Sequence, residues 1–179
     1  MKQYLSPITV FILLIFLFSA CQSTTEAKKD FDHDGISFNI PKGWKVSEVD
    51  TADADYSSIS FDPEAANGTS FMFIEWGKGK VELNTQIKHV QSGYLEHPDY
   101  QQGNIEFTPI EKVEFAKQAA VQTHFKFSIT GIEQEGTLYC FQFPNCDRTL
   151  TIVVQGAAVD NAITAESLKN LEKSLTCSK

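Results

Sequence analysis

The stretch VQTHFKFSI, residues 121–129, decides the fold class of this chain. One set of alternate positions holds Val121, Thr123, Phe125, Phe127 and Ile129, and the other holds Gln122, His124, Lys126 and Ser128. Alternation with a period of two residues is typical of a β-strand with one face on a hydrophobic core and the other toward water. We therefore expect a long, half-buried strand here.

Shorter segments of the same kind lie on both sides of it, separated by turn residues. The expected strands are 36–40, 44–46, 58–61, 69–76, 105–107, 113–115, 138–143 and 150–154. The segment 69–76 is apolar on both faces apart from Glu75, which places it in the interior of a sheet. Residues 131–136 are predicted to form a turn region, and 138–143 and 150–154 a hairpin.

Two segments change to a helical period. Leu83, Ile87, Val90 and Tyr94 form one apolar stripe, with Asn84 or Thr85 as N-cap and Pro98 ending the helix after His97. A second helix follows Asp160 or Thr164 and carries Leu168, Leu171 and Leu175. Short strands joined by tight turns, with two helices, predict an α+β fold: an antiparallel sheet of about 6–9 strands with two main helices packed against it.

The N-terminus is predicted to be an export signal. Residues 8–18 (ITVFILLIFLF) are an apolar run too short for a stable membrane span. The run ends in Ser19-Ala20-Cys21, which looks like a bacterial lipoprotein signal, in which Cys21 is acylated and becomes the first residue. An ordinary signal peptide cut after Ala20 is the alternative. Gln22 in place of the aspartate associated with inner-membrane retention favours the outer membrane of a Gram-negative bacterium.

We therefore divide the chain into a signal peptide (1–20), a flexible tether from the lipidated cysteine (21–30) and one globular domain (31–179). The expected location is the cell envelope, with the membrane contacted through the lipid anchor. The net charge of −8 at pH 7 repels phosphate backbones, so nucleic acid is not an expected partner.

Three cysteines remain for the exported domain: Cys140, Cys146 and Cys177. An oxidising compartment favours a disulfide, and an odd number permits at most one bridge within the chain. The sequence does not choose among the three pairings. No two of the cysteines form a close CxxC pair, which argues against a zinc knuckle or a thioredoxin-type site.

The stretch DFDHDG, residues 30–35, begins like an EF-hand loop. An EF-hand needs a bidentate glutamate at its twelfth position, and here that position is Pro41. We interpret the stretch as a hinge between the tether and the first strand. A surface calcium site of Asp30, Asp32 and Asp34 is the alternative, and we expect no other metal and no cofactor.

No motif of a nucleophilic, phosphate-binding or metalloprotease site occurs. The four histidines lack a neighbour at metal-ligand spacing, and Glu106, Glu111 and Glu114 are interpreted as surface carboxylates. We therefore expect no catalytic residues and no enzyme activity. The aromatic residues Trp44, Trp76, Tyr94 and Tyr100 are expected in the core, with a platform for sugar or peptide as the alternative.

The segment ISFNIPKGWKV, residues 36–46, joins two strands through Ile-Pro-x-Gly-Trp and resembles the opening of PsbP-like and DcrB-like domains. The resemblance covers residues 31–176 and implies an antiparallel sheet with packed helices and, for many members, a non-enzymatic accessory or binding role. We therefore expect a lipid-anchored protein that binds an envelope partner. The alternative is a small periplasmic hydrolase or carbohydrate-binding lipoprotein. A concave site that combines His124 or paired glutamates with an exposed tryptophan would favour this alternative.

Overall fold

The computed structural model describes residues 30–53, 55–65 and 70–178. Its strands are β1 Phe31–His33, β2 Ile36–Phe38, β3 Trp44–Asp50, β4 Tyr56–Pro63, β5 Phe71–Lys78, β6 Glu106–Phe107, β7 Glu111–Phe115, β8 Gln118–Ile129, β9 Ile132–Phe143, β10 Arg148–Ala157 and β11 Thr176–Cys177. Its helices are α2 Leu83–Glu96, α3 Pro98–Gln102, the 3₁₀ turn η1 Ala158–Asp160 and α4 Asn161–Ser174.

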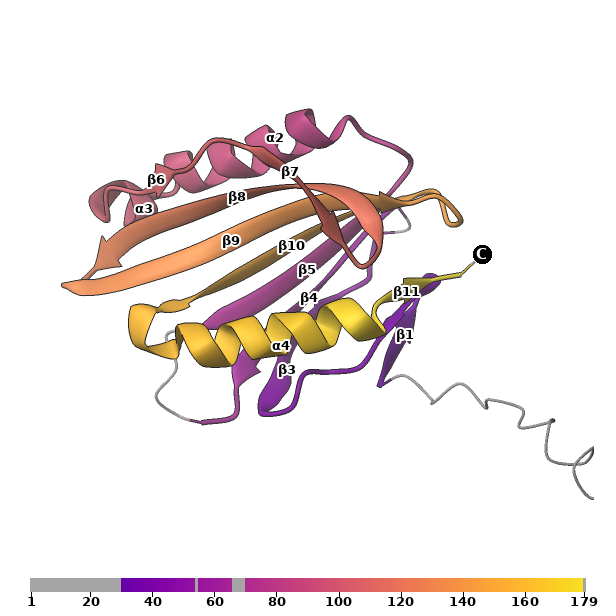
Figure 1. Cartoon of the computed structure of the whole chain (residues 1–179), viewed down its shortest axis with the longest axis horizontal. Coiled ribbons are helices and arrows are strands. Elements are labelled where there is room, and N and C mark those ends of the chain that lie inside the picture. Colours follow the sequence, from indigo (N-terminus) through magenta and orange to yellow (C-terminus); the bar gives the residue numbers. More distant parts are fainter. Residues whose placement is uncertain (1–29, 54, 66–69, 179) are drawn as a thin grey trace, which may run out of the picture.

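An antiparallel sheet of eight strands forms the centre of the molecule, in the order β3-β4-β5-β10-β9-β8-β6, with β7 also pairing with β8 (Figure 1). A small sheet of β1, β2 and β11 joins the two ends of the described chain. Helix α4 and the small sheet cover one face of the large sheet, and α2 with α3 cover the other. The predicted α+β class, the antiparallel sheet and its two main helices are confirmed.

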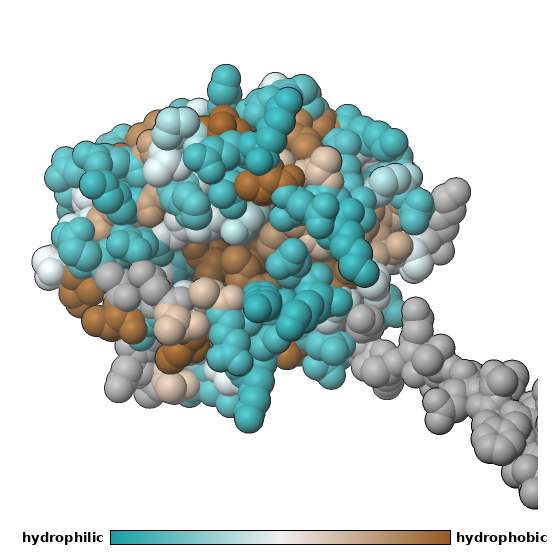
Figure 2. All heavy atoms as spheres, in the orientation of Figure 1, coloured by the Kyte–Doolittle hydropathy of each residue, from teal (hydrophilic) through white to brown (hydrophobic). Residues whose placement is uncertain are grey.

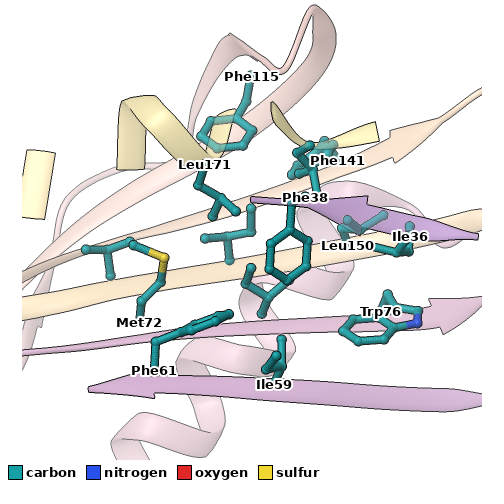
Figure 3. Close-up of a cluster of buried hydrophobic side chains, with 14 of the residues drawn as sticks. Ile36, Phe38, Ile59, Phe61, Met72, Trp76, Phe115, Phe141, Leu150 and Leu171 are labelled. Carbon is teal, nitrogen blue, oxygen red and sulfur yellow. The ribbon is translucent and has the colours of Figure 1, made fainter. Parts of the chain in front are cut away.

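The core on the α4 face follows the alternation of the strands. Leu150 on β10 lies opposite Trp76 of β5 on one side and opposite Phe141 of β9 on the other. Phe38 of the small sheet and Leu171 of α4 complete this layer, and all five side chains are buried (Figure 3). The bulk of the apolar burial that stabilises the fold therefore lies between α4 and the sheet.

The core on the α2 face is smaller. Ile87 of α2 is fully buried against Val121 and Phe125 of β8 and Leu138 of β9. Gly136 on β9 pairs with Phe125, and a Cβ at this position would overlap the Phe125 ring. The aromatic ring therefore occupies the place where a side chain of residue 136 would lie.

The Ile-Pro-x-Gly-Trp segment forms the predicted turn. The Trp44 amide donates to the Pro41 carbonyl at 3.1 Å, and Gly43 has a φ of +83°, which favours glycine. The turn directs the Trp44 side chain into the core, where its indole Nε1 donates to Ser167 Oγ of α4 at 2.7 Å. The motif thus attaches the first long strand to the C-terminal helix.

Three local predictions are wrong. The DFDHDG stretch is not a hinge: β1 pairs with β2 through a tight turn in which Asp34 and Gly35 both have positive φ, the geometry that an Asp-Gly pair favours. The expected turn at 131–136 is shorter, because β9 begins at Ile132. Helix α2 is capped by Glu82, whose carboxylate accepts from the amides of the next helical residues, rather than by Asn84 or Thr85.

A disulfide joins Cys146, in the turn between β9 and β10, to Cys177 on β11, with Cα atoms 5.9 Å apart. It selects one of the three pairings that the sequence left open. Cys140 is a free, buried thiol on β9. No helix within the described ranges is both long and apolar enough to cross a bilayer.

Candidate functional site

A cleft lies between α2 and the sheet, and we call it the α2 cleft. It has a volume of about 670 Å³, and its lining includes Tyr56, Glu75, Gln86, Tyr94, Tyr100 and Thr151. Helix α2 packs over β8 and β9, so the neighbouring part of the sheet toward β4 and β5 stays open beside it. Sheet residues therefore form the floor, and α2 with the start of α3 forms one wall.

The floor carries a half-buried carboxylate, Glu75, in the middle of β5. Its Oε2 accepts a hydrogen bond from the Tyr56 hydroxyl, and its Oε1 accepts one from Gln86 Nε2 at 3.4 Å. Both donors are neutral groups. None of the salt bridges among the described residues involves Glu75, and the nearby Lys78 pairs with Asp55 at 3.6 Å.

The charge of Glu75 influences the titration of three neighbours. Burial, followed by the hydrogen bond to Glu75 and its charge, raises the pKa of Tyr56. Burial also raises the pKa of Tyr94, with further contributions from Tyr100 and Glu75. Burial raises the pKa of the Cys140 thiol to about 12, with the charges of Glu75 and Glu82 adding to the effect. Burial is the main cause of all three shifts, so the phenols of the cleft stay neutral near pH 7.

An aromatic wall closes one end of the α2 cleft. The rings of Tyr94 and Tyr100 lie 4.6 Å apart between centroids, and His97 packs against Tyr100 at 5.5 Å. The Tyr100 hydroxyl donates to Gln155 Oε1 at 3.4 Å, which holds the ring against the sheet. The cleft therefore combines the floor carboxylate of Glu75 with phenol rings, a pairing suited to recognition by charge and by aromatic contact.

The second cleft lies on the opposite face, between α4 and the strands β8, β9 and β10, and has a volume of about 520 Å³. We call it the α4 cleft. Figure 2 shows this face, with an apolar hollow beside α4. Tyr139 and Leu168 belong to its lining, and His124 Nδ1 lies 2.9 Å from Thr137 Oγ1 at its edge.

The structure places the predicted site residues as follows. Trp44 and Trp76 are buried, as expected for core residues, and contribute no exposed platform. Tyr94 and Tyr100 line the α2 cleft instead of lying fully in the core. His124 lies at the α4 cleft, whose lining also includes Glu106 and Glu135, but no tryptophan accompanies them.

Only two of the three aspartates of the DFDHDG stretch lie together: Asp32 and Asp34 line a surface hollow of about 500 Å³, which Arg148 also lines. Asp30 Oδ2 accepts from the Ile40 amide at 3.2 Å, and Asp34 lies 3.7 Å from Arg148. Among the residues whose placement is described, no group of three histidine, cysteine or acidic side chains is arranged to hold a metal ion. Cys21, the predicted lipidation site, and the signal peptide lie outside the described residues.

The sequence reasoning missed Glu75 and Tyr56 as site residues. A signal for Glu75 was present, because it is the one charged residue in the otherwise apolar stretch TSFMFIEW, residues 69–76. A carboxylate in the interior of a sheet must meet donors or water, so its strand must face an opening. Tyr56 has no such signal, because its role depends on the pairing of β4 with β5.

Comparison with known proteins supports the fold and gives no closer identity. No protein-family profile matches the chain, and no curated protein sequence is significantly similar to it. Among solved structures, it is similar to LpqN, a protein involved in cell envelope biogenesis of Mycobacterium tuberculosis, with a TM-score of 0.54, 11% identity and coverage of 80% of this chain and 83% of that one.

Two further structures are similar at the same level. The cyanobacterial PsbP protein (CyanoP) of Synechocystis sp. PCC 6803 has a TM-score of 0.55 and 13% identity, covering 88% of this chain and 97% of that one. A Bacteroides thetaiotaomicron protein has a TM-score of 0.57 and 15% identity, covering 87% of this chain but 50% of that one. Together these likenesses show that the chain has a PsbP-like fold.

Proposed function

We propose that this chain is a lipid-anchored cell-envelope protein whose PsbP-like domain binds another envelope component and does not catalyse a reaction. The observation that carries the binding role is the α2 cleft: an open site whose polar groups converge on one carboxylate. Among the described residues that line it, no hydrogen bond joins a hydroxyl nucleophile to a histidine. Such a site can orient a ligand, but it lacks the activated pair that covalent catalysis requires.

The pKa shifts of the ionisable groups in and near the cleft also argue against catalysis. A general acid or base works best with a pKa near the working pH, whereas the phenols of Tyr56 and Tyr94 are shifted upward, away from neutrality. Cys140 is buried with a raised pKa, so it is a poor nucleophile.

Three features support the envelope location. The Ser19-Ala20-Cys21 sequence follows an apolar run of signal-peptide length, and the Cys146–Cys177 bridge suits an oxidising compartment outside the cytoplasm. The structural similarity to LpqN, which is involved in cell envelope biogenesis, agrees with such a location. Several acyl chains on Cys21 would give stable membrane attachment.

Photo-crosslinking in intact cells tests the binding role. A benzophenone amino acid at Ser92, an exposed position of α2 that lines the α2 cleft, is expected to give a discrete adduct with one envelope component. The matched control carries the same group at Glu166, which is exposed on α4. Identical adducts from both positions, or none from Ser92, would contradict the proposal.

The anchor is tested separately. The variant Cys21→Ser is expected to move from the membrane fraction to the soluble fraction, and mass spectrometry of the wild-type mature N-terminus should show an acylated Cys21. The variant Cys140→Ser controls for loss of a cysteine elsewhere and should remain in the membrane fraction. An unmodified wild-type N-terminus at residue 21 would refute lipidation.

A hydrolase is the second candidate, favoured by the contact between His124 and Thr137 at the α4 cleft. A histidine can activate a hydroxyl by accepting its proton. If this pair is catalytic, the wild type should hydrolyse 4-nitrophenyl acetate well above the buffer rate and His124→Ala should lose that activity. Equal rates in both proteins would exclude a role for the pair in this ester hydrolysis.

A further inference from the structure

We propose that the α2 cleft binds a cationic group, an alkylammonium or guanidinium, with Glu75 as its counter-ion and the Tyr94–Tyr100 pair as its aromatic contact. This inference rests on the proposed function, in that it takes the α2 cleft as the binding site. It names the ligand chemistry that the cleft selects.

The charge of Glu75 is not neutralised by its hydrogen-bond partners. The carboxylate is half-buried in β5, where solvent screens it less than on the open surface. Its two hydrogen-bond donors, Tyr56 and Gln86, are neutral, so they orient the carboxylate without cancelling its charge. A ligand cation would therefore find a fixed, pre-oriented acceptor, which is the arrangement that gives a strong charge-assisted hydrogen bond.

The other ionisable groups described around the cleft do not form a salt bridge with Glu75. Lys78 belongs to the cleft lining, but its ammonium pairs with Asp55 at 3.6 Å and its side chain is 64% exposed. His97 lies 3.9 Å from Asp99, and its Nδ1 accepts from the Asp99 amide, so its position is fixed at the start of α3. His89 and Glu96 are exposed on α2 at the rim. In the described part of the chain, no basic side chain forms a salt bridge with the floor carboxylate.

The aromatic wall offers phenol rings to a cation in the cleft. Tyr94 and Tyr100 form a tilted pair with centroids 4.6 Å apart, and Tyr100 also packs edge-on against Phe127 at 4.8 Å. The rings are therefore held by the core on one side while both residues line the cleft. Phenol faces attract cations, and most strongly where water is partly excluded.

The volume of the α2 cleft bears on the size of the ligand. A cleft of about 670 Å³ lies within the range of small-molecule sites and exceeds what one guanidinium group needs. The cation is therefore part of a larger ligand: either a basic side chain of the envelope partner or a free polyamine. Both sources share the same recognition chemistry, and the experiment separates them.

The test uses the full mature chain purified from membranes in detergent, with ligand-observed NMR titration of N-acetylarginine amide. N-acetylcitrulline amide is its neutral isostere. One charge-assisted hydrogen bond corresponds to about a tenfold difference in Kd, so the wild type should bind the arginine probe about ten times more tightly than the citrulline probe. Glu75→Gln should remove this preference, and Glu111→Gln, on the exposed surface of β7, should retain it.

A second pair of variants tests the role of the Glu75 charge without replacing Glu75. Gln86 Nε2 lies 3.4 Å from the Glu75 carboxylate, so Gln86→Lys would supply an internal counter-ion and abolish the preference for arginine. Gln86→Met, of similar length and without charge, should retain it. Melting curves of all variants verify that they are folded.

The outcomes are distinct. If the arginine probe binds more tightly than spermidine, and its binding depends on Glu75, the source is a basic side chain. If spermidine binds more tightly, again with dependence on Glu75, the source is a free polyamine. Equal affinity of the wild type for the arginine and citrulline probes, or an undiminished preference in Glu75→Gln, would overturn the inference. In that case, a Ser92 crosslink that persists in the Glu75→Gln variant would show that the cleft still binds an envelope component but does not select a cation.

Discussion

The Cys146–Cys177 disulfide should contribute strongly to stability because of the loop it closes. The two cysteines are 31 residues apart, and the segment between them contains β10 and α4. The chain-entropy relation gives about 12 cal/mol/K for such a loop, or about 3.7 kcal/mol at 25 °C. For a chain of this size, each kcal/mol corresponds to about 2–4 °C in Tm, so the double variant Cys146→Ser/Cys177→Ser should melt about 10 °C lower.

Urea unfolding of the oxidised wild type and the double variant measures this difference. The m-value should rise in the variant, because its denatured state is no longer restrained by a cross-link and exposes more surface. Dithiothreitol supplies the matched control: it should lower the stability of the wild type to that of the double variant and leave the double variant unchanged. A difference below about 1 kcal/mol would refute the loop-entropy argument for this bridge.

Three other substitutions test separate parts of the fold, each by urea unfolding. Gly136→Ala should cost about 1–3 kcal/mol, because the new methyl group displaces the Phe125 ring, and unchanged stability would contradict that packing. Gly93→Ala, in the interior of α2 with open space around a Cβ, should instead stabilise by about 0.5–1 kcal/mol, and a loss of stability would show that the site is crowded. Ser167→Ala should cost about 1 kcal/mol despite the higher helix propensity of alanine, because the buried Trp44 indole loses its acceptor; a stabilised variant would argue against that hydrogen bond.

The fold class followed from the sequence because it depends on local periodicity. The alternation at 121–129 gives a strand whose Phe125 and Phe127 are buried and whose His124 is exposed, as expected. The stripe from Leu83 to Tyr94 likewise gives α2. In both segments the side chains that repeat with the secondary-structure period face the core, so burial and local propensity favour the same structure.

The features that could not be predicted depend on contacts between distant segments. Phe31 stacks on Phe38 across the β1–β2 hairpin and packs against Trp76 of β5. Because of these packing partners, the DFDHDG stretch forms the first strand of the small sheet. Its own polar residues do not reveal the partners, which lie elsewhere in the sequence. The choice of Cys177 as the partner of Cys146 depends in the same way on β11 pairing with β2.

The candidate site was hidden for a related reason. Its carboxylate comes from β5, its phenol donor from β4 and its amide donor from α2, and its lining extends to Tyr100 of α3 and Thr151 of β10. Its members are therefore up to 95 residues apart in the sequence, from Tyr56 to Thr151. Sequence spacing reveals metal and catalytic motifs that occur on one element, whereas a cleft assembled from several elements has no characteristic spacing.

The free thiol of Cys140 has a consequence for oxidative folding if the chain is exported as proposed above. Export from the N-terminus would deliver Cys140 and Cys146 to an oxidising compartment before Cys177, and oxidation of the first two thiols would give a non-native bridge. In the fold, Cys140 lies opposite Thr151 in the β9–β10 hairpin and is sealed beneath the sheet surface. Hairpins form in about 1–10 μs, whereas disulfides form in seconds or longer. We therefore expect strand pairing to protect this thiol before an oxidant reaches it, so that the native bridge forms without an isomerase.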